Sequence, residues 1–400
     1  MRTDEFKVVH VSPRVQARGG IEALHALNRT LPLKQVFVAL FDRGSEARDD
    51  YLNLNFTWRT TLGRMRREFA RALAPHAGSI VVYHNEWGLP LLCGGDGAAR
   101  RLAYCLAMPA FHARDLPGSD GLVDGALGIT PAMAEAWREM LPSLGAERVC
   151  VLPLPVAPPL PLQPRRECDG EVVLGYAGRV VSEHKRLDRL PEFLRALDKT
   201  GLRYRFEVLG DGSLRAKLQR EVGARVRFHG WTPKDEFWRV LAGWDGIVFF
   251  TEVDGGPIAM LEAMALGVIP FFPHVEGSMG SRYAPQVDPR CLCETGNIPS
   301  LAAAVHDLLA QDQAKRAALR ARARALVAGH TVEHYGRALS GLLGRVAGLP
   351  RISAAGQTGG HWSDGMPLGF ATRFAPWLLW RQSFPQFLKR SLGRSNARAT

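Results

Sequence analysis

The sequence has few of the features that mark secreted and membrane-spanning proteins. Its 400 residues include only six cysteines, and no apolar run reaches the roughly 18 residues that a bilayer-spanning helix needs. The N-terminal segment, MRTDEFKVVHVS, carries acidic residues early and only a short apolar run, which indicates a first strand rather than a signal peptide. We therefore expect reduced thiols in a cytoplasmic protein that is not integral to a membrane.

Close cysteine pairs are almost absent as well. Only Cys291 and Cys293 lie near each other, and neither a second pair nor nearby histidines accompany them. A structural zinc site usually takes four such ligands, so we expect no metal site.

Acidic residues are fewer than basic ones. The chain has 51 Lys and Arg against 39 Asp and Glu, a formal net charge of +12. This excess favours an anionic partner, such as a phosphate-bearing ligand, an acidic membrane surface or nucleic acid. Because no recognised nucleic-acid-binding motif accompanies the charge, we expect no nucleic-acid partner.

Short β-rich runs alternate with helical periodicity through most of the chain, a pattern typical of parallel sheets covered by helices. In the first half the predicted strands are residues 6–12, 35–41, 79–84, 101–107, 125–130 and 148–153. In the second half they are residues 171–178, 203–210, 225–230, 245–251 and 267–273. Helices are predicted at residues 213–222, 233–242, 257–266 and from about 300 to 349.

A proline-rich segment divides the two halves. Residues 153–164, PLPVAPPLPLQP, contain six prolines and suit neither a helix nor a central strand. We expect a Rossmann-like domain at 1–160, a second one at 165–349, and a basic, aromatic tail at 350–400. Ligands of open α/β sheets bind outside the carboxyl ends of the strands, so we expect a cleft between the two domains.

Candidate ligand-binding residues are most concentrated in residues 251–270, TEVDGGPIAMLEAMALGVIP. Here a predicted strand is followed by an acidic, glycine-containing loop and by the first residues of a helix: Asp254, Gly255, Gly256, Pro257 and Ile258. The free N–H groups of such a helix start suit a phosphate or a sugar hydroxyl. Glu262, one turn later on the same face as Ile258, can accept hydrogen bonds from both hydroxyls of a ribose. A capped helix with a solvated glutamate is the plainer alternative.

Two basic residues follow the first strand of the second half. Arg179 and Lys185 lie just past that strand and just before a helix. Fixed cations at such a place can stabilise the charge of a departing nucleoside diphosphate without a metal. Ordinary surface charge is the alternative reading.

Together these segments resemble the retaining glycosyltransferases of family 4, which have the GT-B fold. The family's Gly-Arg-x(n)-Lys segment reads Gly178, Arg179 and Lys185 here. Its Glu-x7-Glu motif reads Asp254 and Glu262, so the first carboxylate is one methylene shorter than usual. The run Glu-Ala-Met-Ala-Leu-Gly-Val-Ile-Pro at 262–270, similar to the family's Glu-Ala-Met-Ala-x-Gly-x-Pro, a Gly-Asp-Gly loop at 208–218 and a strand-Gly-helix stretch at 228–250 complete the resemblance.

The resemblance implies a GT-B fold, with two Rossmann-like domains whose parallel sheets face an interdomain cleft. It also implies transfer of a sugar from a nucleotide-diphosphate sugar to a glycan or lipid-linked acceptor, with retention of configuration and without a metal or other cofactor. Arg179 and Lys185 would hold the diphosphate, and Glu262 the ribose. Asp254 and the backbone of residues 255–258 would hold the donor sugar. The base would lie near His229, Gly230 and Trp231, and the phosphates would face Gly19 and Gly20.

Two histidines follow predicted strands of the first half, and either is a candidate catalytic residue. Members of the resembling family often use a histidine after the fourth strand. His112 fits that order but stands a few residues late, and His84, with Glu86 nearby, is the alternative. A lone histidine can equally be structural. No carboxylate in this half is an evident nucleophile, so we expect attack on the same face, with the leaving phosphate helping to deprotonate the acceptor.

One stripe of apolar residues is flanked by arginines and indicates either membrane contact or an ordinary domain helix. The stripe consists of Trp58, Leu62, Met65, Phe69 and Leu73, and the arginines are Arg59, Arg64, Arg66, Arg67 and Arg71. Such a helix can lie on the anionic inner face of a membrane. It can also bury its apolar side in a core.

Two other functions are alternatives to sugar transfer. A GT-B-fold protein that binds a sugar nucleotide without transferring it is the main alternative, suggested by the shortened carboxylate at Asp254. A sugar-nucleotide epimerase would need acid and base residues placed across the cleft, and the sequence offers no evident set.

Overall fold

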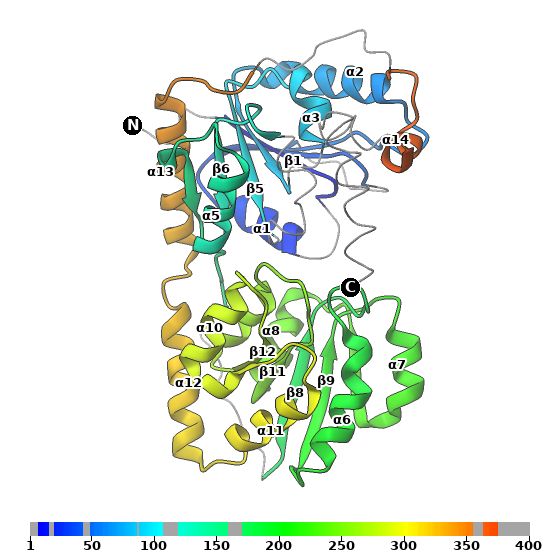
Figure 1. Ribbon diagram of the computed structural model, residues 1–400, viewed down its shortest axis with the longest axis vertical. Helices are drawn as coiled ribbons and strands as arrows, with labels where there is room; N and C mark the ends of the chain where they lie inside the picture. Colours follow the sequence, from blue (N-terminus) through cyan, green and yellow to red (C-terminus); the bar gives the residue numbers. More distant parts are fainter. Residues whose placement is uncertain are drawn as a thin grey trace, which may run out of the picture. The chain divides into compact units, whose positions relative to one another are not determined.

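The computed structural model describes residues 7–15, 20–42, 49–85, 88–106, 119–158, 170–354 and 363–374. By their contacts the residues form two compact units (Figure 1). The second unit is Pro153–Tyr335, and the first consists of the chain up to Leu152 together with the residues from Gly336 onwards.

The first unit contains a seven-stranded sheet in the order β3-β2-β1-β4-β5-β6-β7, and all its strand pairs are parallel. Its strands are β1 (Lys7–Ser12), β2 (Lys34–Ala39), β3 (Tyr51–Asn53), β4 (Ile80–His84), β5 (Arg100–Cys105), β6 (Gly125–Gly128) and β7 (Val149–Val151). Its helices include α1 (Gly20–Asn28), α2 (Leu62–Leu73), α3 (Leu89–Leu92), α5 (Pro131–Met140) and α14 (Leu368–Phe374). The strand order reverses between β1 and β4.

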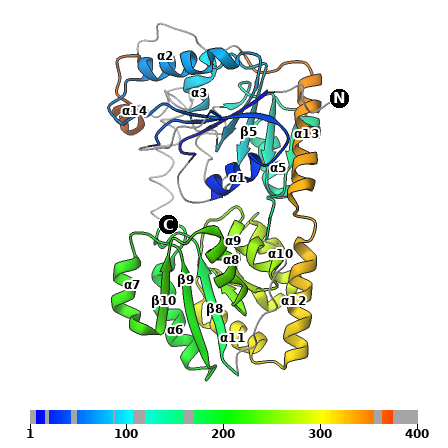
Figure 2. The same cartoon turned by 180° about the vertical axis from the view of Figure 1, so that it is seen from behind.

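The second unit contains a six-stranded parallel sheet in the order β10-β9-β8-β11-β12-β13. Figure 2 shows β10, β9 and β8 side by side. Its strands are β8 (Val172–Ala177), β9 (Tyr204–Leu209), β10 (Val226–Gly230), β11 (Gly246–Val248), β12 (Ile269–Pro273) and β13 (Leu292–Cys293). Its helices are α6 (Leu190–Asp198), α7 (Arg215–Val222), α8 (Lys234–Ala242), α9 (Ile258–Ala265), α10 (Met279–Val287), α11 (Ile298–Leu309) and α12 (Gln313–Val327). The order reverses between β8 and β11, where a ligand site is expected.

The α/β fold class and the parallel sheets predicted from the sequence are confirmed, and every predicted strand is present. Two short strands, β3 and β13, and the helix α10, which contains Pro285, had no sequence signal. The helical region expected from about 300 to 349 consists of three helices, α11, α12 and α13 (Val332–Gly348).

The division between the units differs from the sequence-based boundary at its C-terminal end. We expected residues up to 349 in the second domain, whereas the chain returns to the first unit at Gly336, inside α13. The end of α13 packs on the first unit because Arg100 donates to the carbonyl oxygens of Val346, Ala347 and Leu349. These carbonyls have no intrahelical partner, and a cation there stabilises the helix end.

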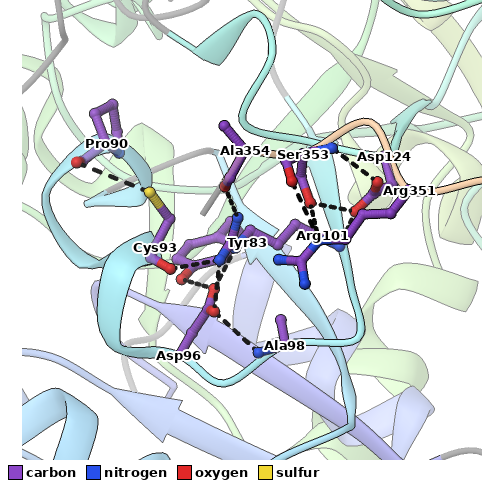
Figure 3. Close-up of polar contacts among 10 residues, drawn as sticks. All are labelled: Tyr83, Pro90, Cys93, Asp96, Ala98, Arg101, Asp124, Arg351, Ser353 and Ala354. Carbon is purple, nitrogen blue, oxygen red and sulfur yellow. Dashed lines mark hydrogen bonds and ion pairs between the residues drawn. The ribbon is translucent and has the colours of Figure 1, made fainter. Parts of the chain in front are cut away.

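A buried polar network holds residues 351–354 on the first unit (Figure 3). Arg101 donates to both carboxylate oxygens of Asp96, over 2.7 and 3.0 Å, and to the carbonyl of Ala354. Asp124 accepts from the backbone N–H groups of Arg101, Ile352 and Ser353. Burial opposes ionisation of Asp124, but these hydrogen bonds outweigh it and lower its pKa.

Helix α2 contains most of the apolar stripe that was predicted either to contact a membrane or to pack in the domain core. Leu62, Met65, Phe69 and Leu73 are buried, so they form a core face. Trp58, before the helix, is 61% exposed. None of the helices in the part of the chain that the structure describes has the length and apolar character needed to span a bilayer.

Four of the cysteines that the structure describes are buried, namely Cys93, Cys105, Cys291 and Cys293, and Cys150 is partly buried. Burial raises the pKa of the Cys291 and Cys293 thiols, in the latter case to about 11. Cys168 lies outside the described residues.

Candidate functional site

The candidate site lies at the carboxyl ends of β8 and β11, the point where the strand order of the second unit reverses. Two loops meet there, residues 178–186 after β8 and residues 251–257 after β11. The carbonyl oxygen of His184 joins them, because it accepts from the backbone N–H of Glu252 at 3.0 Å and from the hydroxyl of Thr251 at 2.6 Å. The topology thus brings together two motifs about 70 residues apart in the sequence.

The loop after β8 is held in an uncommon backbone conformation. His184 and Arg186 have φ angles of 48° and 50°, a region that side chains other than glycine seldom adopt. Its start packs closely on the loop after β9, where a Cβ on Gly210 would lie 1.9 Å from the carbonyl oxygen of Gly178. Only glycine fits at position 210, so this packing fixes the backbone that carries Arg179.

Lys185 and Asp254 form an ion pair between the two loops. Their side chains are 20% and 9% exposed. The other carboxylate oxygen of Asp254 accepts from the backbone N–H of Gly256 at 3.1 Å, which fixes the Gly-Gly turn before α9. Lys185, the residue predicted to hold the diphosphate, therefore directly contacts Asp254, the residue predicted to hold the donor sugar.

Arg179 is exposed at the end of β8. Among the described residues, no carboxylate pairs with its guanidinium. Its backbone carbonyl accepts from the hydroxyl of Tyr176 at 2.8 Å, which fixes the backbone but leaves the side chain available. An exposed cation beside Lys185 makes this strand end suitable for an anionic ligand.

Glu262 lies on α9 and is 7% exposed. Its carboxylate pairs with the ammonium of Lys234, at the start of α8, whose side chain is 55% exposed. Burial raises the pKa of Glu262, and the charge of Lys234 partly opposes that rise. The helix itself begins at Pro257 without a side-chain cap, so its first N–H groups are available to a ligand.

The three residues expected near the base lie at the edge of the sheet. The His229 side chain points towards Glu207, 3.1 Å from its carboxylate, and lines a cavity of about 250 Å³ beside α8. Gly230 has a φ of 75° and its carbonyl accepts from Gly210, while Trp231 is 37% exposed. His229 therefore faces this lateral cavity rather than the junction of the two loops.

The predicted site residues of the first half are only partly described. Gly20 is exposed at the first position of α1, whereas Gly19, Glu86 and His112 lie outside the described residues. His84 has no exposed surface and contacts His10 through its ring nitrogen at 3.0 Å. Its side chain is therefore part of the core of the first unit.

Sequence reasoning missed two features of this site. Lys234 was not singled out because a lysine at a helix start carries no motif, although it pairs with Glu262. Glu252 was also missed, and it binds Arg186 and Arg189 from the loop after β8 and the turn before α6. Both contacts join residues distant in the sequence, so spacing alone gives no signal for them.

Residues 171–311 match the family model described as Glycosyl transferases group 1. A search among curated protein sequences found no match.

Several solved structures have a similar fold at low sequence identity. Sucrose-phosphate synthase from Thermosynechococcus elongatus superposes with a TM-score of 0.64 at 15% identity, over 86% of this chain and 99% of that one. WaaG, a glycosyltransferase involved in lipopolysaccharide biosynthesis, gives 0.62 at 17%, over 84% and 99%. S. aureus TarM, in complex with UDP, gives 0.56 at 16%, over 70% of this chain, which spans only 59% of TarM. The chain thus has the GT-B fold, and its residues 171–311 match the model of the family Glycosyl transferases group 1.

Proposed function

We propose that the protein transfers a sugar from a nucleotide-diphosphate sugar to a glycan or lipid-linked acceptor, with retention of the anomeric configuration. The observation that carries this proposal is the meeting of Lys185 and Asp254 at the switch point of the second unit. The matched family domain covers both residues and Glu262. A binding pocket for a charged, hydroxyl-rich ligand needs this combination of cation and carboxylates.

Each residue has a distinct role in the proposed donor complex. Arg179 and Lys185 bind the diphosphate, and the uncapped start of α9 adds N–H groups for an anion or a sugar hydroxyl. Glu262 accepts hydrogen bonds from the ribose hydroxyls. Once the diphosphate draws Lys185 away, Asp254 is free to accept hydrogen bonds from the donor sugar.

The proposed reaction exchanges one bond at the anomeric carbon for another. The acceptor hydroxyl forms the new C–O bond on the face from which the nucleoside diphosphate departs, and the leaving phosphate oxygen takes both the electron pair of the broken bond and the acceptor proton. Arg179 and Lys185 stabilise the charge that develops on this oxygen, so the proposal requires no metal at the diphosphate.

We further propose that the acceptor belongs to polysaccharide or glycoconjugate synthesis and is met at the inner face of a membrane. An exposed surface on the first unit supports this proposal. Trp58 is 61% and Phe370 50% exposed, and the backbone hydrogen bond from Gly369 to Trp58, 2.8 Å long, holds them near each other. Arg59, Arg64, Arg67 and Arg71 are exposed on and beside α2. Exposed aromatics among cations suit an anionic bilayer interface.

Transfer and simple binding are distinguished by turnover. Radiolabelled nucleotide sugars with different bases and sugars are to be screened for binding, slow hydrolysis and transfer to candidate glycans and lipid-linked acceptors, with NMR of the product to determine the anomeric configuration. We expect turnover of one donor by the wild type and weakened binding of that donor by Glu262→Gln. A donor that binds tightly but is never hydrolysed or transferred would support the non-catalytic alternative instead.

Membrane contact is tested by co-sedimentation of the full chain with vesicles of neutral or anionic phospholipid. We expect binding to the anionic vesicles alone, a decrease with salt because surface charge is screened, and loss of binding in Trp58→Ser/Phe370→Ser. A matched control is Trp231→Ser, which removes an exposed tryptophan of the second unit. Equal sedimentation of all variants would contradict the proposed surface.

A further inference from the structure

Three buried histidines of the first unit lie together. This histidine cluster consists of His10 on β1, His25 on α1 and His84 at the end of β4, which are 1%, 0% and 0% exposed. One ring nitrogen from each lies within 4.8 Å of those of the other two. It is uncommon for an apolar core to contain three imidazole rings from separate helices and strands.

The hydrogen bonds of Gln35 determine which nitrogen of His10 carries a lone pair. The Gln35 amide donates to the carbonyl of Asn28 at 2.5 Å, so its oxygen, 3.0 Å from Nε2 of His10, is an acceptor. Nε2 of His10 therefore carries the proton, and Nδ1 has the lone pair. This Nδ1 faces Nε2 of His84 at 3.0 Å.

His25 is arranged in a similar way. Its Nε2 lies 2.9 Å from the hydroxyl of Ser12, which can accept the ring proton. Its Nδ1 is buried and has no hydrogen-bond partner among the described residues. Gln35 and Ser12 thus act on the outer nitrogens of two rings, as the supporting residues of metal-bound histidines commonly do.

The spacing of the rings fits a tetrahedral metal ion. Zinc–nitrogen bonds of about 2.0–2.1 Å in a tetrahedral site separate the nitrogens by about 3.3 Å and the ring centroids by about 5 Å. The centroids of the cluster are 4.6, 5.2 and 5.7 Å apart. Small rotations of the side chains therefore bring all three nitrogens to bonding distance.

The charge around the cluster is compatible with a cation. Arg29 is close enough to the cluster for its charge to act on His10 and His25. Its guanidinium is neutralised by Asp50 at 2.7 Å and lies over the ring of Phe37.

We propose that the histidine cluster binds a divalent transition-metal ion, best matched by zinc, that joins β1, α1 and β4. Imidazole nitrogens are ligands suited to zinc, and three of them leave a fourth position for a small ligand such as water. The ion would have a structural role in the first unit, independent of the diphosphate chemistry of the second. Sequence reasoning expected no metal because it considered only closely spaced ligands, whereas these three come from distant segments.

Metal content is the direct test. The full chain is to be stripped with a chelator, dialysed against buffered zinc and analysed by mass spectrometry of the metal. We expect stoichiometric zinc in the wild type and in the control His306→Gln, which removes an exposed histidine outside the cluster. We expect loss of zinc in His25→Gln and His84→Gln, with circular dichroism to verify that each variant is folded.

A ligand exchange keeps the test informative if those variants misfold. Cobalt bound to the wild type should give the visible bands of a four-coordinate ion, and His84→Cys should retain the metal and add a thiolate-to-cobalt charge-transfer band. Zinc should also raise the melting temperature of the stripped wild type. A wild type that takes up no zinc, or a folded His84→Gln variant that retains it in full, would overturn the proposal.

Discussion

Lys185 and Asp254 neutralise each other across the carboxyl ends of β8 and β11. One belongs to the loop after β8 and the other to the loop after β11, and they are proposed to bind opposite parts of the same donor. A buried charge without a partner is costly, so the ion pair stabilises both side chains. The proposed donor complex would exchange this ion pair for one between Lys185 and the diphosphate.

Truncation of the Asp254 side chain to alanine is predicted to lower the kcat/KM of sugar transfer more than its replacement by glutamate. Asp254→Ala removes the carboxylate proposed to orient the sugar and leaves Lys185 unpaired, so we expect kcat/KM to fall by about 10²-fold or more. Asp254→Glu restores the carboxylate length of the resembling family and should stay within about tenfold of the wild type. Steady-state kinetics with the donor found by screening measure both. Equal activity of wild type and Asp254→Ala would remove Asp254 from the site.

Donor affinity is predicted to decline in mild acid because of Glu262. Burial raises its pKa above the ordinary value of 4.5, so the carboxylate becomes protonated, and stops accepting two hydrogen bonds, at a higher pH than an exposed glutamate would. Glu262→Gln should weaken donor binding at pH 7 by roughly 10- to 100-fold, the range for hydrogen bonds to a charged group. Calorimetric titrations between pH 4.5 and 8 measure this.

Lys234 provides the control for that pH dependence. Its charge opposes the rise in the Glu262 pKa, so Lys234→Met should raise this pKa further and move the loss of donor affinity to higher pH. Glu262→Gln should give a flat profile over the same range. Identical profiles for the wild type and Lys234→Met would contradict a role for Glu262 in donor binding.

The network of Figure 3 is predicted to be a strong contributor to the stability of the first unit. The Asp96 side chain is 0% exposed and that of Arg101 only 3%. Arg101→Leu leaves the Asp96 charge buried without its partner, which typically costs about 3–5 kcal/mol. Arg101→Leu/Asp96→Leu removes both charges and should cost less than the sum of the two single changes. Urea unfolding of the four proteins gives this coupling.

Stability of the metal-free protein is predicted to fall with acid through the histidine cluster. The folded-state pKa of His10 is about 4, against 6.5 for an ordinary histidine, so below pH 6.5 the unfolded chain binds a proton that the folded chain does not. His10 alone therefore accounts for about 2 kcal/mol of lost stability between pH 7 and pH 5, and His25 and His84 act in the same direction.

Urea unfolding in the presence of a chelator at pH 7 and pH 5 measures this effect. The pH-dependent loss should be smaller in His10→Leu and unchanged in His306→Gln, whose histidine is exposed. If the free energy of unfolding of the wild type were the same at both pH values, the buried histidines would not be neutral as the structure indicates.

Local patterns were enough to predict most of the secondary structure. Strands such as β1 and β8 are short apolar runs between turn residues, and that signal depends only on neighbouring residues. The motif around Asp254 and Glu262 could be recognised for the same reason, because its loop, its two glycines and the start of its helix follow each other along the chain. β3 was missed because its three residues are too few to show a period.

Such local patterns could not predict contacts between segments that are distant in the sequence. The sequence by itself determined the α/β class, the alternation of strands and helices, and the motifs carrying Arg179, Lys185 and Glu262. Only the tertiary structure decided that Lys185 pairs with Asp254, that α13 ends on the first unit, and that His84 lies in the core beside His10. The physical reason is that burial and ion pairing depend on which faces pack together, and a face is formed by segments that the sequence keeps far apart.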